Sequence, residues 1–128
     1  MSTEKCLSVL IVDDNEMTRT ILRMMIQGEE FNVVGIANNG QSAIEQVKSL
    51  QPDIVCLDIL MPGDDGLRVL EKIKTLRPQT QVLMVTASRD RETVKKAVGS
   101  GADGFIVKPF NSGTVLDALL KAGARLRG

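Results

Sequence analysis

The chain has 128 residues, the length of one typical domain, and we expect a single domain over residues 1–128 with its core at about 6–124. Hydrophobic residues make up 43% of it and charged residues 25%, and 16 basic side chains balance 16 acidic ones, which argues against disorder. The lack of histidine excludes histidine-based triads, metal sites and phosphocarriers, and two cysteines are too few for a zinc ribbon. No apolar run approaches the ~20 residues of a membrane span, so we expect a cytoplasmic protein without membrane contact.

Short apolar runs alternate with segments of helical period along the whole chain. In chain order we predict strands over residues 7–12, 33–37, 54–57, 82–85 and 105–107. The helices between and after them are marked by apolar residues within 17–25, 43–50, 67–76, 94–98 and 115–120, and the last helix is expected to end within residues 124–128. The runs are rich in Val, Ile and Leu without polar alternation, as in strands that are buried on both faces. Cys56 lies in the third run, and we expect it to act as a small buried hydrophobic residue.

Residues at the predicted helix ends support this assignment. Pro52 and Pro78 follow the second and third helices, and the residue before a proline is disfavoured in the helical region. Asp90 and Asn111 stand where the N-caps of the fourth and fifth helices are expected. The alternation predicts an α/β fold of the (βα)₅ type, which is a doubly wound, parallel five-stranded sheet with right-handed crossovers and helices on both faces.

Polar residues follow four of the five predicted strands. Asp13 and Asp14 follow the first strand, Asp58 the third, Thr86 the fourth and Lys108 the fifth. In an open α/β sheet the ligand site lies outside the carboxyl ends of the strands, so these side chains are expected to converge. An Asp at one strand end is often only a helix cap, whereas four such strand ends together indicate a functional site.

The charges of this group indicate its ligand. Three crowded carboxylates repel one another, and Lys108 together with one divalent cation would neutralise them. Carboxylates, carbonyls and waters are the ligands of Mg²⁺. A carboxylate beside a metal, a lysine and a hydroxyl suits phosphoryl transfer, with Asp58 as the nucleophile and Asp13 and Asp14 holding the metal.

Four motifs make the chain resemble a known family, the CheY-like receiver domains of bacterial two-component response regulators. The motifs are Val12-Asp13-Asp14, Leu57-Asp58-Ile59-Leu60-Met61-Pro62 with Gly66, Val85-Thr86-Ala87 and Val107-Lys108-Pro109-Phe110. The resemblance covers about residues 6–124. It implies the flavodoxin-like receiver fold, with strand order 2-1-3-4-5.

The resemblance also implies a role for each acidic residue. Asp58 would accept a phosphoryl group from a sensor histidine kinase or a histidine phosphotransferase. Asp14, Asp58 and the backbone carbonyl of Leu60 would ligate Mg²⁺ directly, and Asp13 would hold it through water. The protein would assist its own phosphorylation and dephosphorylation without being an enzyme in the ordinary sense.

Three further residues receive roles from the same resemblance. Lys108 would pair with Asp58 and then bind the phosphoryl group, and Thr86 would move to hydrogen-bond a phosphoryl oxygen. Phe105 occupies the place of the switch aromatic, which turns inward when Thr86 moves, although a plain core ring is the alternative. The Lys108–Pro109 bond is often cis in the family, whereas the sequence alone favours trans.

Two positions depart from well-known members of the family. Leu60 is apolar where several relatives carry a polar residue, and Ser88 is short and uncharged. In the family these positions tune the access of water to the phosphoaspartate. We therefore predict slower intrinsic dephosphorylation than in members with a polar or acidic pair there.

By analogy with the family, a downstream protein binds the face formed by the fourth helix, fifth strand and fifth helix. The basic residues expected on this face are Arg89, Arg91, Lys95, Lys96, Lys121, Arg125 and Arg127, and the candidate apolar contacts are Val98, Phe105 and Val115. The first helix also has more apolar residues than one buried face needs, and relatives use part of that helix against the kinase. We expect a monomer or weak dimer.

Several functions remain open at this stage. The chain is a stand-alone receiver, a phosphorelay intermediate that passes the phosphoryl group on, or the receiver half of a longer regulator with a DNA-binding or enzymatic output domain. A small aspartyl phosphatase is disfavoured, because it needs a second acid where Leu60 stands. Direct nucleic-acid binding is not expected, since the charge is balanced and no helix-turn-helix unit follows the last helix.

Overall fold

A computed structural model describes residues 6–87 and 90–127, without the side chain of Arg127. Its elements in chain order are β1 (Leu7–Val12), α1 (Glu16–Ile26), β2 (Phe31–Ala37), α2 (Gly40–Leu50), β3 (Ile54–Asp58), β4 (Leu60–Met61), β5 (Asp64–Asp65), α3 (Gly66–Leu76), β6 (Gln81–Thr86), α4 (Arg91–Gly99), β7 (Gly104–Val107) and α5 (Ser112–Arg127). All five predicted strands and all five predicted helices are present, with ends extended by a few residues.

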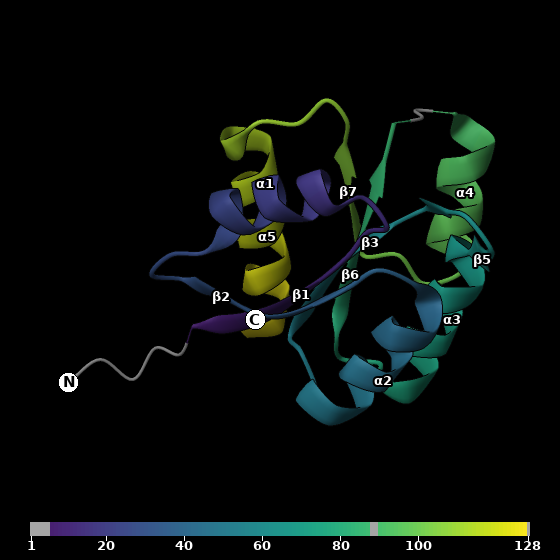
Figure 1. Ribbon diagram of the computed structural model, residues 1–128, viewed down its shortest axis with the longest axis horizontal. Coiled ribbons are helices and arrows are strands. Elements are labelled where there is room, and N and C mark those ends of the chain that lie inside the picture. Colours follow the sequence, from purple (N-terminus) through teal and green to yellow (C-terminus); the bar gives the residue numbers. More distant parts are fainter. Residues whose placement is uncertain (1–5, 88–89, 128) are drawn as a thin grey trace.

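The main sheet is parallel and has the order β2-β1-β3-β6-β7. Counted as the five strands of this sheet alone, that is the predicted order 2-1-3-4-5, and β3 lies at its centre (Figure 1). The carboxyl ends of β1, β3 and β6 are in register, with Val12 beside Leu57 and Asp58 beside Val85. This register brings the polar residues that follow these strands to one edge of the sheet.

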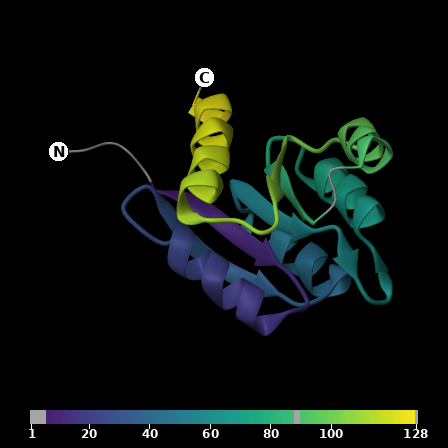
Figure 2. The same ribbon diagram turned by 90° about the horizontal axis from the view of Figure 1, so that it is seen from above.

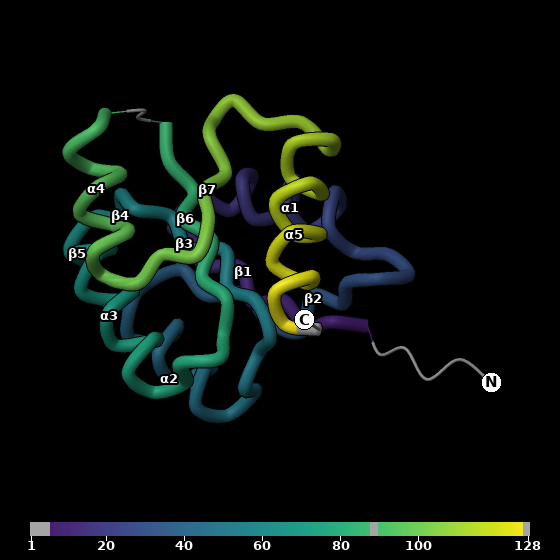
Figure 3. The backbone as a smooth tube through the Cα atoms, turned by 180° about the vertical axis from the view of Figure 1, so that it is seen from behind, coloured from purple at the N-terminus to yellow at the C-terminus, as the bar shows by residue number. Residues whose placement is uncertain are grey.

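Helices cover both faces of the sheet. Helices α1 and α5 lie together on one face, and α2, α3 and α4 lie on the other (Figures 1 and 3); the view from above separates the two layers (Figure 2). Alternate residues of β1 serve the two cores, with Val9 and Ile11 facing α1 and α5 and Leu10 and Val12 facing the other layer. Cys56 is fully buried in the first of these cores, as predicted, and its burial raises the pKa of its thiol to about 12.

The predicted N-caps are confirmed. Asp90 accepts a hydrogen bond from the backbone N–H of Thr93, and Asn111 accepts one from that of Thr114. Val115, in contrast, was expected as an apolar contact on the outer face of the fifth helix, and that expectation is wrong. Its side chain is fully buried in the core beneath α5, because it lies on the side of the helix that packs onto the sheet.

A short antiparallel hairpin, not predicted from the sequence, lies directly after β3. Strands β4 and β5 pair Leu60 with Asp65, and the turn between them contains Gly63 at a φ of +81°, which favours glycine. The carboxylate of Asp64 accepts a 3.1 Å hydrogen bond from the N–H of Gly40, which joins the hairpin to the start of α2. The hairpin therefore holds the segment after Asp58 against α2.

None of the helices in the described part of the chain is both long enough and apolar enough to span a lipid bilayer.

Candidate functional site

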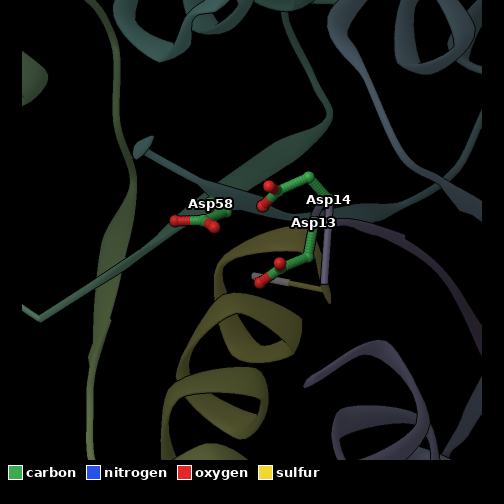
Figure 4. Close-up of side chains that lie close together, drawn as sticks. All are labelled: Asp13, Asp14 and Asp58. Carbon is green, nitrogen blue, oxygen red and sulfur yellow. The ribbon is translucent and has the colours of Figure 1, made fainter. Parts of the chain in front are cut away.

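Three carboxylates gather at the carboxyl edge of the sheet. Asp13 and Asp14 follow β1, and Asp58 is the last residue of the neighbouring strand β3. Oxygens from the three side chains lie within 4.8 Å of one another, and Figure 4 shows the side chains grouped at this edge. Asp13 and Asp58 are only 1% and 5% exposed, whereas Asp14 is open to solvent. The predicted convergence of these residues is confirmed.

Asp13 presents one unsatisfied oxygen to this cluster. Its Oδ1 accepts a 2.9 Å hydrogen bond from the N–H of Asn15, at the start of α1. Its Oδ2 is buried and has no hydrogen-bond partner within the described residues; the nearest cation is the Nζ of Lys108, at 3.8 Å. An orphaned buried carboxylate oxygen is costly without a ligand, so this atom fits a site that takes a cation.

Asp58 is held between a hydrogen-bond donor and a cation. Its Oδ1 accepts a 3.1 Å hydrogen bond from the N–H of Leu60, and its Oδ2 lies 3.8 Å from the Nζ of Lys108. Burial, with a smaller contribution from the charges of Asp13 and Asp14, raises the pKa of Asp58 to about 6 despite the lowering effects of the Leu60 N–H and Lys108. The carboxyl group is therefore mostly ionised at neutral pH, but its ionised form is less stable here than it is in water.

Thr86 and Lys108 complete the predicted group from the other side of β3. Thr86 ends β6 and is buried, and its backbone carbonyl accepts a 2.8 Å hydrogen bond from the N–H of Lys108. The Lys108–Pro109 peptide bond is cis, as the family resemblance implied and against the preference of the sequence alone. These two residues lie at the same sheet edge as the acids.

Phe105 and Leu60 lie at the border of the site. Phe105, in β7, pairs with Met84 of β6, is half-buried against the core, and lines a groove of about 580 Å³ between β7 and α5. The side chain of Leu60 is 74% exposed and points no polar atom toward Asp58. Ser88, the second position expected to tune dephosphorylation, lies outside the described residues.

The chemistry of this donor set fits a divalent cation. The carboxylates of Asp13, Asp14 and Asp58 supply hard oxygen ligands, and the orphaned Oδ2 of Asp13 is among them. One lysine faces three acids, so the site retains excess negative charge that a cation would neutralise. Among the residues described, this is the one acidic cluster with such spacing.

The expected partner face is partly open. Arg91, Lys95 and Lys96 are exposed on α4, as is the apolar side chain of Val98. On α5, Lys121 pairs with Asp117 at 3.0 Å, and Arg125 donates a 3.0 Å hydrogen bond to Gln81. The expected contacts of Arg89 and Arg127 fall on side chains that the structure does not describe. The prediction that α1 has more apolar residues than its buried face needs is confirmed, since Met17, Ile21 and Met24 are exposed.

The fold and the site together define a signalling receiver of the flavodoxin-like class. The response regulator receiver domain family model matches residues 9–120, and the chain belongs to this family. It is a CheY-like receiver domain of two-component signalling.

Relatives and solved structures agree with this assignment. The chain is 42% identical over 111 residues to the chemotaxis protein CheY of Halobacterium salinarum, covering 87% of this chain and 92% of the relative. It is 35% identical over 125 residues to the nitrate/nitrite response regulator NarL of Escherichia coli, covering 97% of this chain and 58% of the relative. A structure of the CheX–CheY–BeF₃–Mg complex of Borrelia burgdorferi matches at a TM-score of 0.86 and 34% identity, covering 91% of this chain and 89% of that one.

Proposed function

We propose that the protein is a phosphorylation-activated switch in which Asp58 accepts a phosphoryl group from a partner's phosphohistidine. The observation that supports this most is the buried carboxylate of Asp58, with Lys108 3.8 Å away and two further acids beside it. Because this chain contains no histidine, the donor histidine lies outside it, and a sensor kinase or a histidine phosphotransferase is the donor we propose.

In the proposed reaction, an oxygen of the Asp58 carboxylate attacks the phosphorus in line with the leaving histidine nitrogen. The new O–P bond forms as the N–P bond breaks, and the imidazole leaves with the electron pair. Lys108, whose Nζ lies 3.8 Å from Oδ2 of Asp58, would neutralise charge on the transferred oxygens. Asp13, Asp14, Asp58 and the backbone carbonyl of Leu60 are the groups that would hold Mg²⁺, which neutralises phosphoryl charge when bound.

The proposed response uses Thr86 and Phe105. Thr86 lies at the end of β6, beside Asp58, and its hydroxyl would move to bond the new phosphoryl oxygen. Phe105, on the neighbouring strand, would then turn into the space that Thr86 leaves. The result is a changed face of α4, β7 and α5 for a downstream protein to bind.

A second candidate is the receiver half of a longer regulator. The match to NarL favours it, because this chain spans 58% of that relative. A phosphorelay role uses the same chemistry in both directions, and return of the phosphoryl group from Asp58 to a histidine phosphotransferase would distinguish it.

Intact-mass spectrometry tests the proposal. With Mg²⁺ and acetyl phosphate, the native chain should gain the mass of one phosphoryl group, and it should gain none when EDTA removes the metal. Asp58→Asn should gain nothing, while Asp117→Asn, which removes an exposed acid on α5, should behave as the native chain does. A phosphorylated Asp58→Asn variant, or a folded and metal-binding native chain that gains no mass, would contradict the proposal.

A further inference from the structure

An arginine outside the acidic cluster contacts the backbone of one of its members. The Nη1 of Arg19, on α1, donates a 2.8 Å hydrogen bond to the backbone carbonyl oxygen of Asp13. The side chain of Arg19 is half-buried. Asp13 follows the last residue of β1, where a carbonyl no longer has a regular partner from the sheet, so the arginine satisfies an atom that would otherwise be left unbonded.

Two further polar atoms of Asp13 also make hydrogen bonds, and one does not. Its N–H donates to the carbonyl of Ala37 at 3.0 Å, and its Oδ1 accepts from the N–H of Asn15 at 2.9 Å. With Arg19 on the carbonyl, the atom left without a hydrogen bond within the described chain is Oδ2, which belongs to the acidic cluster. The contacts around Asp13 therefore leave one oxygen for a ligand.

The carbonyl that Arg19 holds also affects the next residue. It belongs to the peptide unit that joins Asp13 to Asp14, and a peptide unit is planar. Fixing its oxygen fixes the direction in which the backbone enters Asp14, the exposed member of the cluster. One hydrogen bond thus constrains two of the three carboxylates.

We propose that Arg19 is a positioning residue for the divalent-cation site, setting the orientation of Asp13 and Asp14 through the backbone carbonyl between them. This inference rests on the proposed function, because it concerns the affinity of the same site for Mg²⁺. Groups that orient metal ligands without touching the metal commonly change its affinity by about 10- to 100-fold when they are removed.

The sign of the effect separates positioning from simple electrostatics. A guanidinium close to the site repels a cation, so loss of its charge alone would tighten Mg²⁺ binding. Loss of positioning would weaken binding, even though a positive charge has been removed. The two explanations therefore predict opposite changes.

Calorimetric Mg²⁺ titration of the full chain tests this inference, with Mn²⁺ broadening of NMR signals near Asp13 and Asp58 to verify the site. We expect Arg19→Met to bind Mg²⁺ about tenfold more weakly. Arg19→Lys, which keeps the charge and a hydrogen-bond donor, should have an affinity for Mg²⁺ between those of the native chain and Arg19→Met. Arg23→Met is the matched control and should bind as the native chain does, because Arg23 is exposed one turn further along α1 and, among the described residues, its backbone carbonyl rather than its side chain makes the hydrogen bond, from the N–H of Gln27.

Equal or tighter binding by Arg19→Met would overturn the inference. If Arg19→Met does not fold in the absence of metal, Arg19→Lys decides the question by the same criterion. A native chain that binds no Mg²⁺ would instead refute the proposed function, and this inference with it.

Discussion

The Nζ of Lys108 lies 3.8 Å from Oδ2 of Asp58, whose side chain is almost completely enclosed. Asp13 shares the same lysine at the same distance, so one cation serves two buried carboxylates while Asp14 adds a third charge nearby. The site therefore has an excess of negative charge before any ligand binds, and the free energy of unfolding should depend on it.

The first prediction concerns Asp58 and pH. Burial raises its pKa from 3.8 to about 6, so the folded protein binds this proton more tightly than the unfolded chain does. The contribution of the protonated Asp58 to the free energy of unfolding is fully present below about pH 4, and it is lost as the pH rises through 6 and the carboxyl group ionises. At pH 7.5 without metal, Asp58→Asn should be more stable than the native chain by on the order of 2 kcal/mol.

Urea unfolding followed by circular dichroism at several pH values between 4 and 7.5 checks this. The difference between Asp58→Asn and the native chain should shrink toward pH 4, and Asp117→Asn should show little difference at any pH. A stability difference that does not change with pH would mean that Asp58 titrates as an ordinary exposed carboxyl.

The second prediction concerns the segment that follows Asp58. A Cβ on Gly66 would lie 2.5 Å from the backbone oxygen of Ile59, so Gly66→Ala forces two backbone segments apart. We expect a loss of about 1–3 kcal/mol in the free energy of unfolding. Gly99→Ala is the matched control, since a Cβ there meets nothing within 4 Å, and it should cause no loss of stability. Equal stability of the two variants in thermal unfolding would argue against the tight contact.

The third prediction concerns Leu60, which is 74% exposed two residues after Asp58. An apolar side chain there cannot orient water toward an acyl phosphate, so the phosphorylated form should be long-lived. Leu60→Glu should speed dephosphorylation by on the order of tenfold, less than a fully positioned general base supplies. Leu120→Glu, on the exposed side of α5, should not. The decay of the phosphorylated mass measures both rates, and a native half-life of only seconds would count against the prediction.

The fourth prediction uses the lack of tryptophan in the chain. Phe105→Trp places a single indole at the half-buried position beside the groove between β7 and α5. If this ring turns inward on activation, its emission should shift to shorter wavelength when Mg²⁺ and acetyl phosphate are added. The shift should disappear when Thr86→Ala is combined with Phe105→Trp. An unchanged spectrum in a protein that is phosphorylated would identify Phe105 as a plain core residue.

Most of the fold was predictable from the sequence, as was the gathering of the polar residues at one edge of the sheet. The strands β1, β3 and β6 form apolar runs because both of their faces are covered, and the polar residues Asp13, Asp58 and Thr86 end those runs at one edge of the sheet. Burial on both faces is wrong for the edge strand β2, in which Val34 and Ile36 are exposed. Because the strands are parallel, the end of each apolar run in the sequence lies at the same edge of the sheet. The caps at Asp90 and Asn111 followed from the same kind of local rule.

Features that depend on pairs of distant residues were not predictable in this way. The β4–β5 hairpin is two residues on each side, too short for a periodic pattern, and it is held by Asp64 reaching Gly40 on another element. The contact of Arg19 with the Asp13 carbonyl likewise depends on how α1 lies against β1. The exposure of Val115 was predicted wrongly. Helical spacing identifies the apolar residues of α5 but does not show which of them contact the sheet, and Val115 is fully buried there.

The most direct test of the central claim is to locate the phosphoryl group. Borohydride reduces an aspartyl phosphate to homoserine, and peptide mass spectrometry then identifies the modified position. After treatment with Mg²⁺ and acetyl phosphate, we predict homoserine at position 58 alone, and none when either reagent is left out. Homoserine at position 13 or 14, or an unmodified Asp58 in a folded chain that binds Mg²⁺, would contradict the account.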